Sequence, residues 1–351
     1  MIYYASRQKG TLNNILNSQV RALHRSLRTG STVIWDLHEV ENGINQQLFD
    51  KVHRHLTRDP TSQVIVNLSD ENIPVVPNSV QVYTDFIQQW RPQQVEVWCS
   101  QPDALAVLAQ QNPGIRTREV SHWEHATAHH RQLLEHPQIH KYTVPTHRLV
   151  SLNRRYHPLR AQLIYSLWSR RQQLNYTLGS GDPWGGESEE EYQQQEWQDL
   201  TLKSHVMAWQ QTCNPWRQLS CDITEWEYDH TWNFTSTADI CVVVESRHSK
   251  FPRNDAFITE KTFRPIAMGK PIIVCGQPSA IQTLQRWGYQ TINTHSDIQH
   301  VIKTAQHILD LSNDEYQQKL QGWQVTAQQN QQRFLQRTSP SAACGAAQKA
   351  P

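Results

Sequence analysis

The stretch FITEKTFRPIAMGKPIIV, from Phe257 to Val274, contains the signals of a short helix that leads directly into a strand. Thr259 has a side-chain oxygen that can cap the first turn of a helix. Gly269 stands where a helix C-terminus needs a left-handed residue, and Pro271 prevents the helix from continuing. The apolar run Ile272–Cys275 is typical of a buried parallel strand. The stretch therefore predicts an α/β fold with a parallel sheet.

Glu260 and Lys261 fall in the first turn of this predicted helix. A helix N-terminus already carries partial positive charge, so a lysine there favours a nearby anion such as a pyrophosphate. A carboxylate beside it, such as that of Glu260, can accept hydrogen bonds from ribose hydroxyls. Arg264 could add a second cation or pair with Glu260 at i,i+4. The pattern is compatible with a nucleotide site or with a surface helix that carries an ion pair.

Short apolar strands alternate with amphipathic helical patterns ahead of this stretch. The predicted strands there are 32–37, 63–69, 94–100 and 117–121, and the predicted helices are 12–28, 44–57, 81–90 and 103–111. A second alternation has strands at 147–153, 238–245 and 271–276, and helices at 156–173, 278–287 and 297–335. Such alternation is typical of parallel sheets with crossover helices, so we expect two Rossmann-like domains.

The chain therefore divides into an N-terminal domain, 1–146, and a C-terminal domain, 147–336. Residues 178–199 are an acidic insertion rich in Gly, Pro and Ser, which we expect to be a mobile solvated loop or a lid over a ligand. The last residues, 337–351, have the composition of a disordered tail.

The overall composition excludes several classes of protein. With 33 Lys and Arg against 32 Asp and Glu, the formal net charge is +1, so the chain has no general basic field for coating nucleic acid. The N-terminal sequence has no apolar segment of signal-peptide length, and no run reaches the about 20 apolar residues of a membrane span. We therefore expect a cytoplasmic protein.

Cysteine and histidine spacing gives no sign of a metal centre. The six cysteines are scattered without close pairs, which favours buried reduced thiols over disulfides or a zinc site. His125 and His129 have the i,i+4 spacing of a helical metal site, with His130 beside them, but no Cys or acidic cluster completes it. We expect neither a metal nor a bound cofactor.

Two separated elements carry a resemblance to a known family. The first is VVVESRHSKFPRNDAFITEKTFRPIAMGKPIIV (242–274), with Glu245 and Ser246 after an apolar strand and TEK at the start of the helix. The second is LVSLNRRYHPLRAQLIYSLW (149–168), with Ser151, Asn153 and Arg160. Together they resemble the donor-binding region of the α-1,3-fucosyltransferase family, whose pattern has Ser-Asn-Pro and an Arg, then Glu-Asn-Ser, then Asp-Tyr-Ile-Thr-Glu-Lys.

The resemblance implies a GT-B fold, in which two Rossmann-like domains face a cleft and the C-terminal domain holds a nucleotide sugar. Carried over by position, Glu260 would hold the ribose, while Lys261 and Arg160 would neutralise the pyrophosphate. Glu245 and Ser246 would line the nucleotide end of the pocket. The N-terminal domain would bind the acceptor.

This sequence departs from the family pattern in two places. The Asn of Glu-Asn-Ser is missing, and Ala256-Phe257 replaces the Tyr. Both residues are associated with guanine recognition in the family, so the base, and with it GDP-fucose as the donor, stays open. One residue, Leu152, separates Ser151 from Asn153, which are adjacent in the family pattern, and the shifted register makes Arg154 a second candidate for the cation of that element.

An inverting sugar transfer needs a carboxylate in the acceptor half to take the hydroxyl proton. Ligands of open α/β sheets gather at the carboxyl ends of strands, where we favour Asp70 or Glu71. Asp36, Glu39 and Glu124 qualify by the same criterion.

The sequence thus predicts a metal-independent, inverting glycosyltransferase. It would move a sugar from a nucleoside-diphosphate sugar, its co-substrate, to a glycan or other hydroxyl acceptor. Two alternatives stay open. One is a nucleotide- or sugar-binding protein derived from a transferase without turnover. The other is a glycosyltransferase that acts on modified nucleic-acid bases, which the balanced charge makes the less favoured partner.

Overall fold

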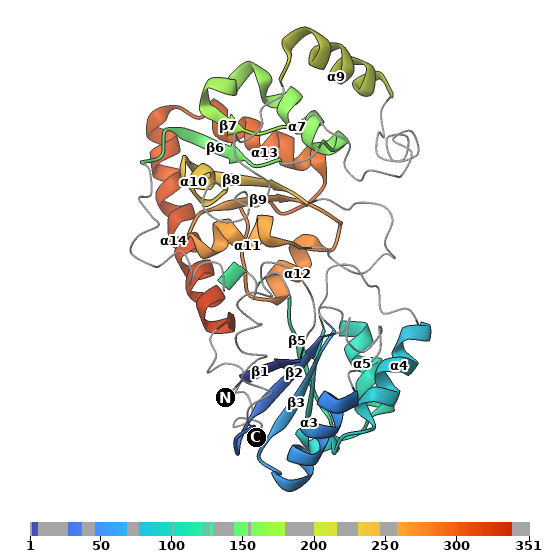
Figure 1. The fold of residues 1–351 in the computed structure, drawn as a ribbon. Coiled ribbons are helices and arrows are strands. Elements are labelled where there is room, and N and C mark those ends of the chain that lie inside the picture. The colour runs from blue at the N-terminus through green and yellow to red at the C-terminus, as the bar shows by residue number, and fades with distance from the viewer. Residues whose placement is uncertain are drawn as a thin grey trace. The chain divides into compact units, whose positions relative to one another are not determined.

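The computed structural model describes residues 2–5, 27–36, 46–68, 77–99, 102–121, 124, 127–128, 144–153, 156–179, 200–215, 231–245 and 258–338. The chain divides into two compact units, Met1–His122 and Trp123–Pro351. Figure 1 shows the ribbon of both units, and each is described by itself below.

The first unit is built on a parallel sheet of five strands in the order β1-β2-β3-β4-β5. The strands are β1 (Ile2–Ala5), β2 (Thr32–Asp36), β3 (Gln63–Asn67), β4 (Val95–Cys99) and β5 (Arg116–Glu119). The connections contain the helices α3 (Gln46–Arg58), α4 (Pro77–Ile87) and α5 (Pro102–Gln111) and the 3-10 turn η1 (Pro92–Gln94). Sequence neighbours are sheet neighbours, so the order of these strands never reverses.

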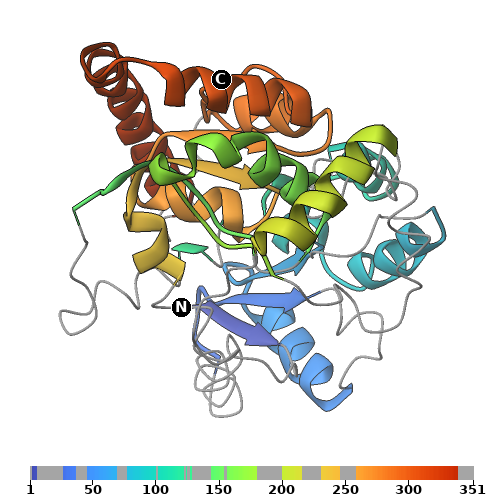
Figure 2. The same ribbon diagram turned by 90° about the horizontal axis from the view of Figure 1, so that it is seen from above.

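Helices α3, α4 and α5 lie on one face of this sheet, as the view from above also shows (Figure 2). Alternate strand residues point to that face, and the fully buried Trp35 of β2 is the largest side chain among them. Its ring centroid lies 6.4 Å from that of Phe49 in α3 and 5.8 Å from that of Phe86 in α4. The edge strand β5 has the sequence RTRE, whose charges discourage pairing with another strand.

The second unit is built on a parallel sheet of four strands in the order β7-β6-β8-β9. The strands are β6 (His147–Ser151), β7 (Leu174–Tyr176), β8 (Ala238–Val244) and β9 (Ile272–Cys275). The helices are α7 (Pro158–Leu167), η2 (Trp168–Gln173, 3-10), α9 (Leu200–Cys213), α10 (Thr231–Ser236), α11 (Glu260–Ala267), α12 (Ala280–Arg286), α13 (Ile298–Asp310) and α14 (Asn313–Thr338).

Helices cover both faces of this second sheet. Leu149 and Ile240 pack with α7 and α13 on one face, whereas Val150 and Cys241 pack with α11 and α12 on the other (Figure 1). The long helix α14 contributes side chains to both layers. Strands buried on both faces have continuous apolar sequences, which is why ADICVVV and IIVC could be recognised as strands.

The parallel α/β architecture predicted from the sequence is confirmed within each unit. The elements that had not been predicted are the short β1, β7, α10 and η1 and the 14-residue helix α9. The units divide between His122 and Trp123, ahead of the boundary expected between 146 and 147, because Glu124 already contacts the second unit through Tyr289 and Arg337. Helix α14 continues to Thr338, two residues into the expected tail. The expected helix 12–28 up to residue 26, the insertion from residue 180 and the tail from 339 lie outside the described residues.

Candidate functional site

The strand order of the second sheet reverses between β6 and β8. From β6 the chain passes through α7 to β7 on one side, and from β8 it passes through α11 to β9 on the other. In open α/β sheets, ligands bind outside the carboxyl ends of the strands at such a reversal. We call the carboxyl ends of β6 and β8, with the first turns of α7 and α11, the switch-point site.

Helix α11 begins as the sequence predicted. Thr259 is the N-cap, and its hydroxyl oxygen accepts a hydrogen bond from the Lys261 backbone N–H at 3.3 Å. Glu260 and Lys261 therefore lie in the first turn, which confirms their expected position. At the other end Gly269 has a φ of 68°, the left-handed conformation expected for the residue that ends this helix.

Glu245 follows the last residue of β8 and is fully buried. Its Oε1 accepts hydrogen bonds from the Thr259 backbone N–H at 2.9 Å and from the Thr262 hydroxyl at 2.6 Å. Its Oε2 accepts a hydrogen bond from the Thr259 hydroxyl at 2.7 Å. This carboxylate therefore supplies negative charge at the positive end of α11, which stabilises both partners.

The Lys261 ammonium lies between two carboxylates. Its Nζ is 3.7 Å from an oxygen of Glu260 and 3.9 Å from an oxygen of Glu245, and it donates to the Thr259 hydroxyl at 3.2 Å. The side chains of Lys261 and Glu260 are 19% and 27% exposed, so both can be reached from solvent. The electrostatic conflict inferred from the sequence is thus already relieved by the protein's own carboxylates.

The Glu260 carboxyl is held in its charged form. Burial by itself would raise the pKa of Glu260, but the positive charges of Lys261 and Arg264 and the hydrogen bonds at the helix start outweigh it. The net result is a pKa below the ordinary value for glutamate. Glu260 is consequently a hydrogen-bond acceptor at neutral pH, as a residue that holds ribose hydroxyls must be.

Arg160 approaches the same place from the other side of the strand reversal. It lies in the first turn of α7 and is only 2% exposed. Its Nη2 donates to the carbonyl oxygen of Val244, the last residue of β8, at 3.2 Å. Arg160 and Lys261 therefore both lie next to the Val244–Glu245 segment, although they are 101 residues apart in the sequence.

The other residues of the second resemblance element, 149–168, hold the end of β6 in place. Ser151 is the last residue of the strand, and the buried Asn153 donates from Nδ2 to its hydroxyl oxygen at 3.0 Å. The Asn153 backbone N–H donates to the Thr177 hydroxyl at 2.8 Å, just beyond β7. These contacts fix the loop that leads into α7.

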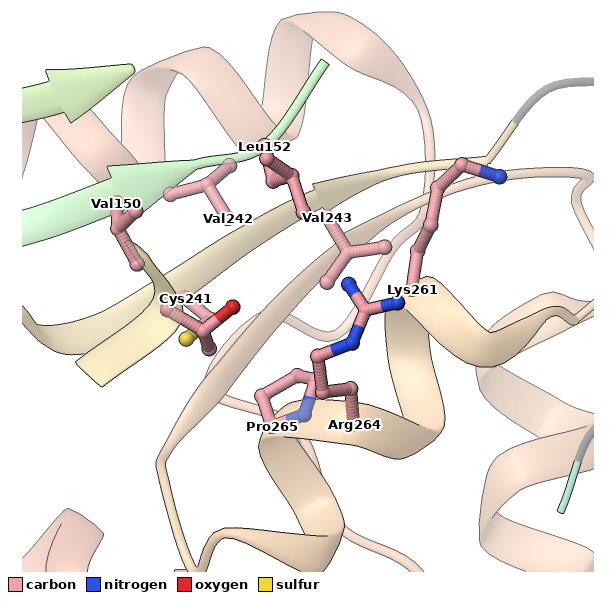
Figure 3. Close-up of a pocket in the computed structure, with 9 residues that line it drawn as sticks. Val150, Leu152, Cys241, Val242, Val243, Lys261, Arg264 and Pro265 are labelled. Carbon is pink, nitrogen blue, oxygen red and sulfur yellow. The ribbon is translucent and has the colours of Figure 1, made fainter. Parts of the chain in front are cut away.

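A small hollow adjoins Lys261 between α11 and the sheet (Figure 3). It is lined by Val150, Leu152, Thr235, Cys241, Val242, Val243, Lys261, Arg264 and Pro265. Arg264 points from α11 toward β8, whereas the Lys261 ammonium points away from Cys241 (Figure 3). The cavity volume of about 20 Å³ leaves room for roughly one water molecule. The hollow alone is therefore too small for a nucleotide.

Cys241 does not act as a nucleophile in this hollow. Burial raises the pKa of its thiol to about 12, although the positive charges of Lys270 and Arg264 oppose the shift. The thiolate is the reactive form of cysteine, so a thiol with this pKa is inert at neutral pH.

Several residues predicted for the site lie outside the described part of the chain. They are Arg154 and Ser246 of the donor site and the candidate bases Asp70, Glu71 and Glu39; the side chain of Asp36 is also outside it. Glu124 is described, and it is 1% exposed, with the Arg337 guanidinium 2.7 and 3.0 Å from its oxygens and the Tyr289 hydroxyl donating to it. Glu124 is therefore the buried counterion of Arg337.

Sequence reasoning missed the part that Thr262 takes in the site. Its hydroxyl reaches Glu245 from the third residue after the N-cap, a position from which side chains regularly reach back to helix ends. That spacing could have been noticed in the motif, whereas the partner, 17 residues away, could not.

Within the ranges the structure describes, no group of three or more His, Cys, Asp and Glu side chains is arranged to hold a metal. None of the helices described there combines the length and the apolar character that crossing a bilayer requires.

The comparisons with known proteins match this chain in structure and not in sequence. No protein-family model and no curated protein sequence matches the chain. The solved structure of the N-terminal domain of trehalose-6-phosphate phosphatase from Candida albicans is similar, with a TM-score of 0.48 and 10% sequence identity. The likeness covers 97% of this chain and 77% of that one.

Proposed function

We propose that this protein is a glycosyltransferase of GT-B type that uses a nucleoside-diphosphate sugar, without a metal and with inversion at the sugar. The observation that carries the proposal is the convergence of Arg160, Lys261 and Glu260 on the strand reversal between β6 and β8. These are the positions that the resemblance to α-1,3-fucosyltransferases assigns to the pyrophosphate and the ribose. A strand reversal is also where fold geometry favours a nucleotide.

The proposed chemistry assigns a role to each side chain. Lys261 would bind the pyrophosphate, and the buried Arg160 would add positive charge behind it, so that both stabilise the negative charge that the pyrophosphate gains as the bond to the sugar breaks. Glu260, held ionised, would accept hydrogen bonds from the ribose hydroxyls. The acceptor hydroxyl would attack the anomeric carbon from the opposite face while a carboxylate, Asp70 or Glu71, takes its proton. The bonding electrons would leave with the nucleoside diphosphate.

A binding protein without turnover is the second candidate, and two observations favour it. Lys261 already has carboxylate neighbours within 4 Å on both sides, and the hollow beside it has room for roughly one water molecule. A lysine whose charge is already balanced by the protein's own carboxylates stabilises a leaving diphosphate less, which is what a protein that binds a nucleotide without turnover would show.

Calorimetric titration with GDP, UDP, ADP and CDP tests whether the site takes a nucleotide. We expect one diphosphate to bind the wild-type protein and Lys261→Met to lose that binding, since Met retains the apolar stem but not the charge. Lys303→Met is the matched control, because Lys303 is an exposed lysine on α13. If none of the four binds, or if both variants bind as the wild type does, the proposed site is wrong.

Turnover separates the two candidate functions. The sugar derivatives of the diphosphate that binds are incubated with a panel of glycan and small hydroxyl acceptors, and the released diphosphate is measured. Acceptor-dependent release that disappears in Lys261→Met supports the transferase. Binding with no release across the panel supports the binding protein.

A further inference from the structure

Glu245 is the buried residue of the switch-point site with the most complete set of contacts inside the protein. It has no exposed surface, and its two oxygens accept three hydrogen bonds, all from the first turn of α11. A ligand cannot contact a side chain with no accessible surface without first moving the helix. The geometry therefore assigns Glu245 a different part from the one the family resemblance suggested.

We propose that Glu245 is a positioning residue, which sets the first turn of α11 and through it the placement of Lys261 and Glu260, without contacting the ligand. Its link to nucleotide binding rests on the proposed function. The link to α11 does not, because it follows from the contacts of the protein alone.

The pattern of hydrogen bonds explains how one carboxylate fixes a whole helical turn. Oε1 receives the N-cap backbone N–H of Thr259 and the hydroxyl of Thr262, so it joins the two ends of the turn. Oε2 receives the Thr259 hydroxyl, whose oxygen in turn accepts from the Lys261 backbone N–H. The Thr259 hydroxyl is thus oriented by Glu245, and it orients Lys261.

The sheet holds Glu245 in a fixed position. Glu245 follows β8 directly, and its backbone N–H donates to the Cys275 carbonyl oxygen at 3.0 Å. Gly276 lies beside the Glu245 side chain: a Cβ at position 276 would be at ordinary van der Waals distance, 3.8 and 3.9 Å, from its Cβ and Cγ. The carboxylate is therefore held by the sheet, and α11 is held by the carboxylate.

A charge-neutral replacement distinguishes positioning from direct ligand contact. In Glu245→Gln, the amide oxygen can still accept from the Thr259 N–H and the Thr262 hydroxyl, and the amide nitrogen can take the place of the Lys261 ammonium as a donor to the Thr259 hydroxyl oxygen. The geometry survives while the charge is lost. In Glu245→Ala, the geometry is lost as well.

The test has a first readout that needs no ligand, namely hydrogen exchange measured by mass spectrometry on peptides covering 258–267. We expect exchange of the first turn of α11 to rise about tenfold in Glu245→Ala and in Thr262→Val, the usual effect of losing a capping interaction. Glu245→Gln and Thr262→Ser should stay close to wild type. Thr304→Val is the matched control, since the Thr304 hydroxyl bonds within its own helix, α13, to the His300 carbonyl oxygen at 2.9 Å. Unchanged exchange in Glu245→Ala overturns the proposal.

The second readout is the affinity for the nucleoside diphosphate that binds the wild type, measured well below the melting temperature. We expect the dissociation constant to rise at least about tenfold in Thr262→Val and to return in Thr262→Ser, with Thr304→Val unchanged. A loss of affinity in Glu245→Gln while its exchange stays at the wild-type level would mean that the charge acts on the ligand directly, and it overturns positioning. If no diphosphate binds the wild type, the proposed function fails, and the exchange data alone decide the part of Glu245.

Discussion

Replacing Arg337 tests how much the burial of a carboxylate determines the strength of an ion pair. The Arg337 guanidinium makes two bonds to Glu124, at 2.7 and 3.0 Å, and lies 5.6 Å from the centre of the Trp287 ring. Glu124 is 1% exposed, so Arg337→Met would leave its negative charge without a cation and out of reach of water. Removing one partner of a buried pair costs 3–5 kcal/mol, and the remaining bond from Tyr289 favours the lower end, about 3 kcal/mol.

The matched control is an ion pair of similar geometry on the surface. Arg170 makes bonds of 2.5 and 2.8 Å to Asp310, but the two side chains are 31% and 52% exposed. Arg170→Met should therefore cost about 0.5 kcal/mol, as exposed pairs do. Both pairs lie within the second unit and join residues far apart in the sequence.

Urea unfolding followed by tryptophan fluorescence measures both variants. Ten of the 13 tryptophans, Trp287 among them, lie in the second unit, so the signal reports mainly on that unit. Adding Glu124→Gln to Arg337→Met should restore about 1–2 kcal/mol of the free energy of unfolding, since the unpaired buried charge is then removed. If Arg337→Met and Arg170→Met cost the same, or if the second change recovers nothing, the argument from burial is refuted.

Three further predictions concern single positions. Gly288→Ala should cost about 1–2 kcal/mol in urea unfolding, because φ is 87° there and the new Cβ would lie 2.9 Å from an arginine nitrogen of α14; a neutral result would contradict the steric argument. Hydrogen bonds, the strongest of them from the Ser62 hydroxyl, hold the pKa of Asp59 well below its usual range. The ionised Asp59 therefore stabilises the fold in full above the unfolded pKa of about 3.9, and this stabilisation is lost as the pH falls below that value. The urea midpoint should consequently drop less between about pH 6 and about pH 3 in Asp59→Asn than in wild type, and equal drops would count against this. Iodoacetamide should label Cys213, exposed on α9, in the folded protein, but should label Cys241 only after unfolding; peptide mass spectrometry distinguishes the two.

The parts of the fold that could be predicted depend on neighbours in the sequence. Thr259 and Gly269 marked the two ends of α11 because capping is a local requirement of the backbone. The strands β8 and β9 were evident from unbroken apolar runs, which strands buried on both faces require. The short strand β7 has only three residues, LNY, and such a run carries too little periodicity to be recognised.

The interior of the candidate site could not be predicted, because it consists of contacts between distant residues. The sequence indicated that Lys261 needs an anion, and a pyrophosphate was the simplest source. The structure supplies Glu245, 16 residues earlier in the sequence and at the end of another element, which no local pattern could pair with it. The partnership of Glu124 with Arg337 spans 213 residues and is equally invisible in the sequence.

The charge balance of the switch-point site indicates what a nucleotide sugar would still require. Arg160, Lys261 and Arg264 bring three positive charges, and Glu245 and Glu260 bring two negative ones, so the described side chains leave a single positive charge. The pyrophosphate of a nucleotide sugar carries two negative charges, one more than this site would neutralise. An unneutralised charge in a partly buried site costs free energy. The sequence offers further cations soon after β6 and β8, namely Arg154, Arg155 and Arg247. If the site binds a pyrophosphate, neutralising Arg154 or Arg247 should therefore weaken binding as much as neutralising Lys261 does. If neither replacement weakens binding, the site binds a ligand with less negative charge.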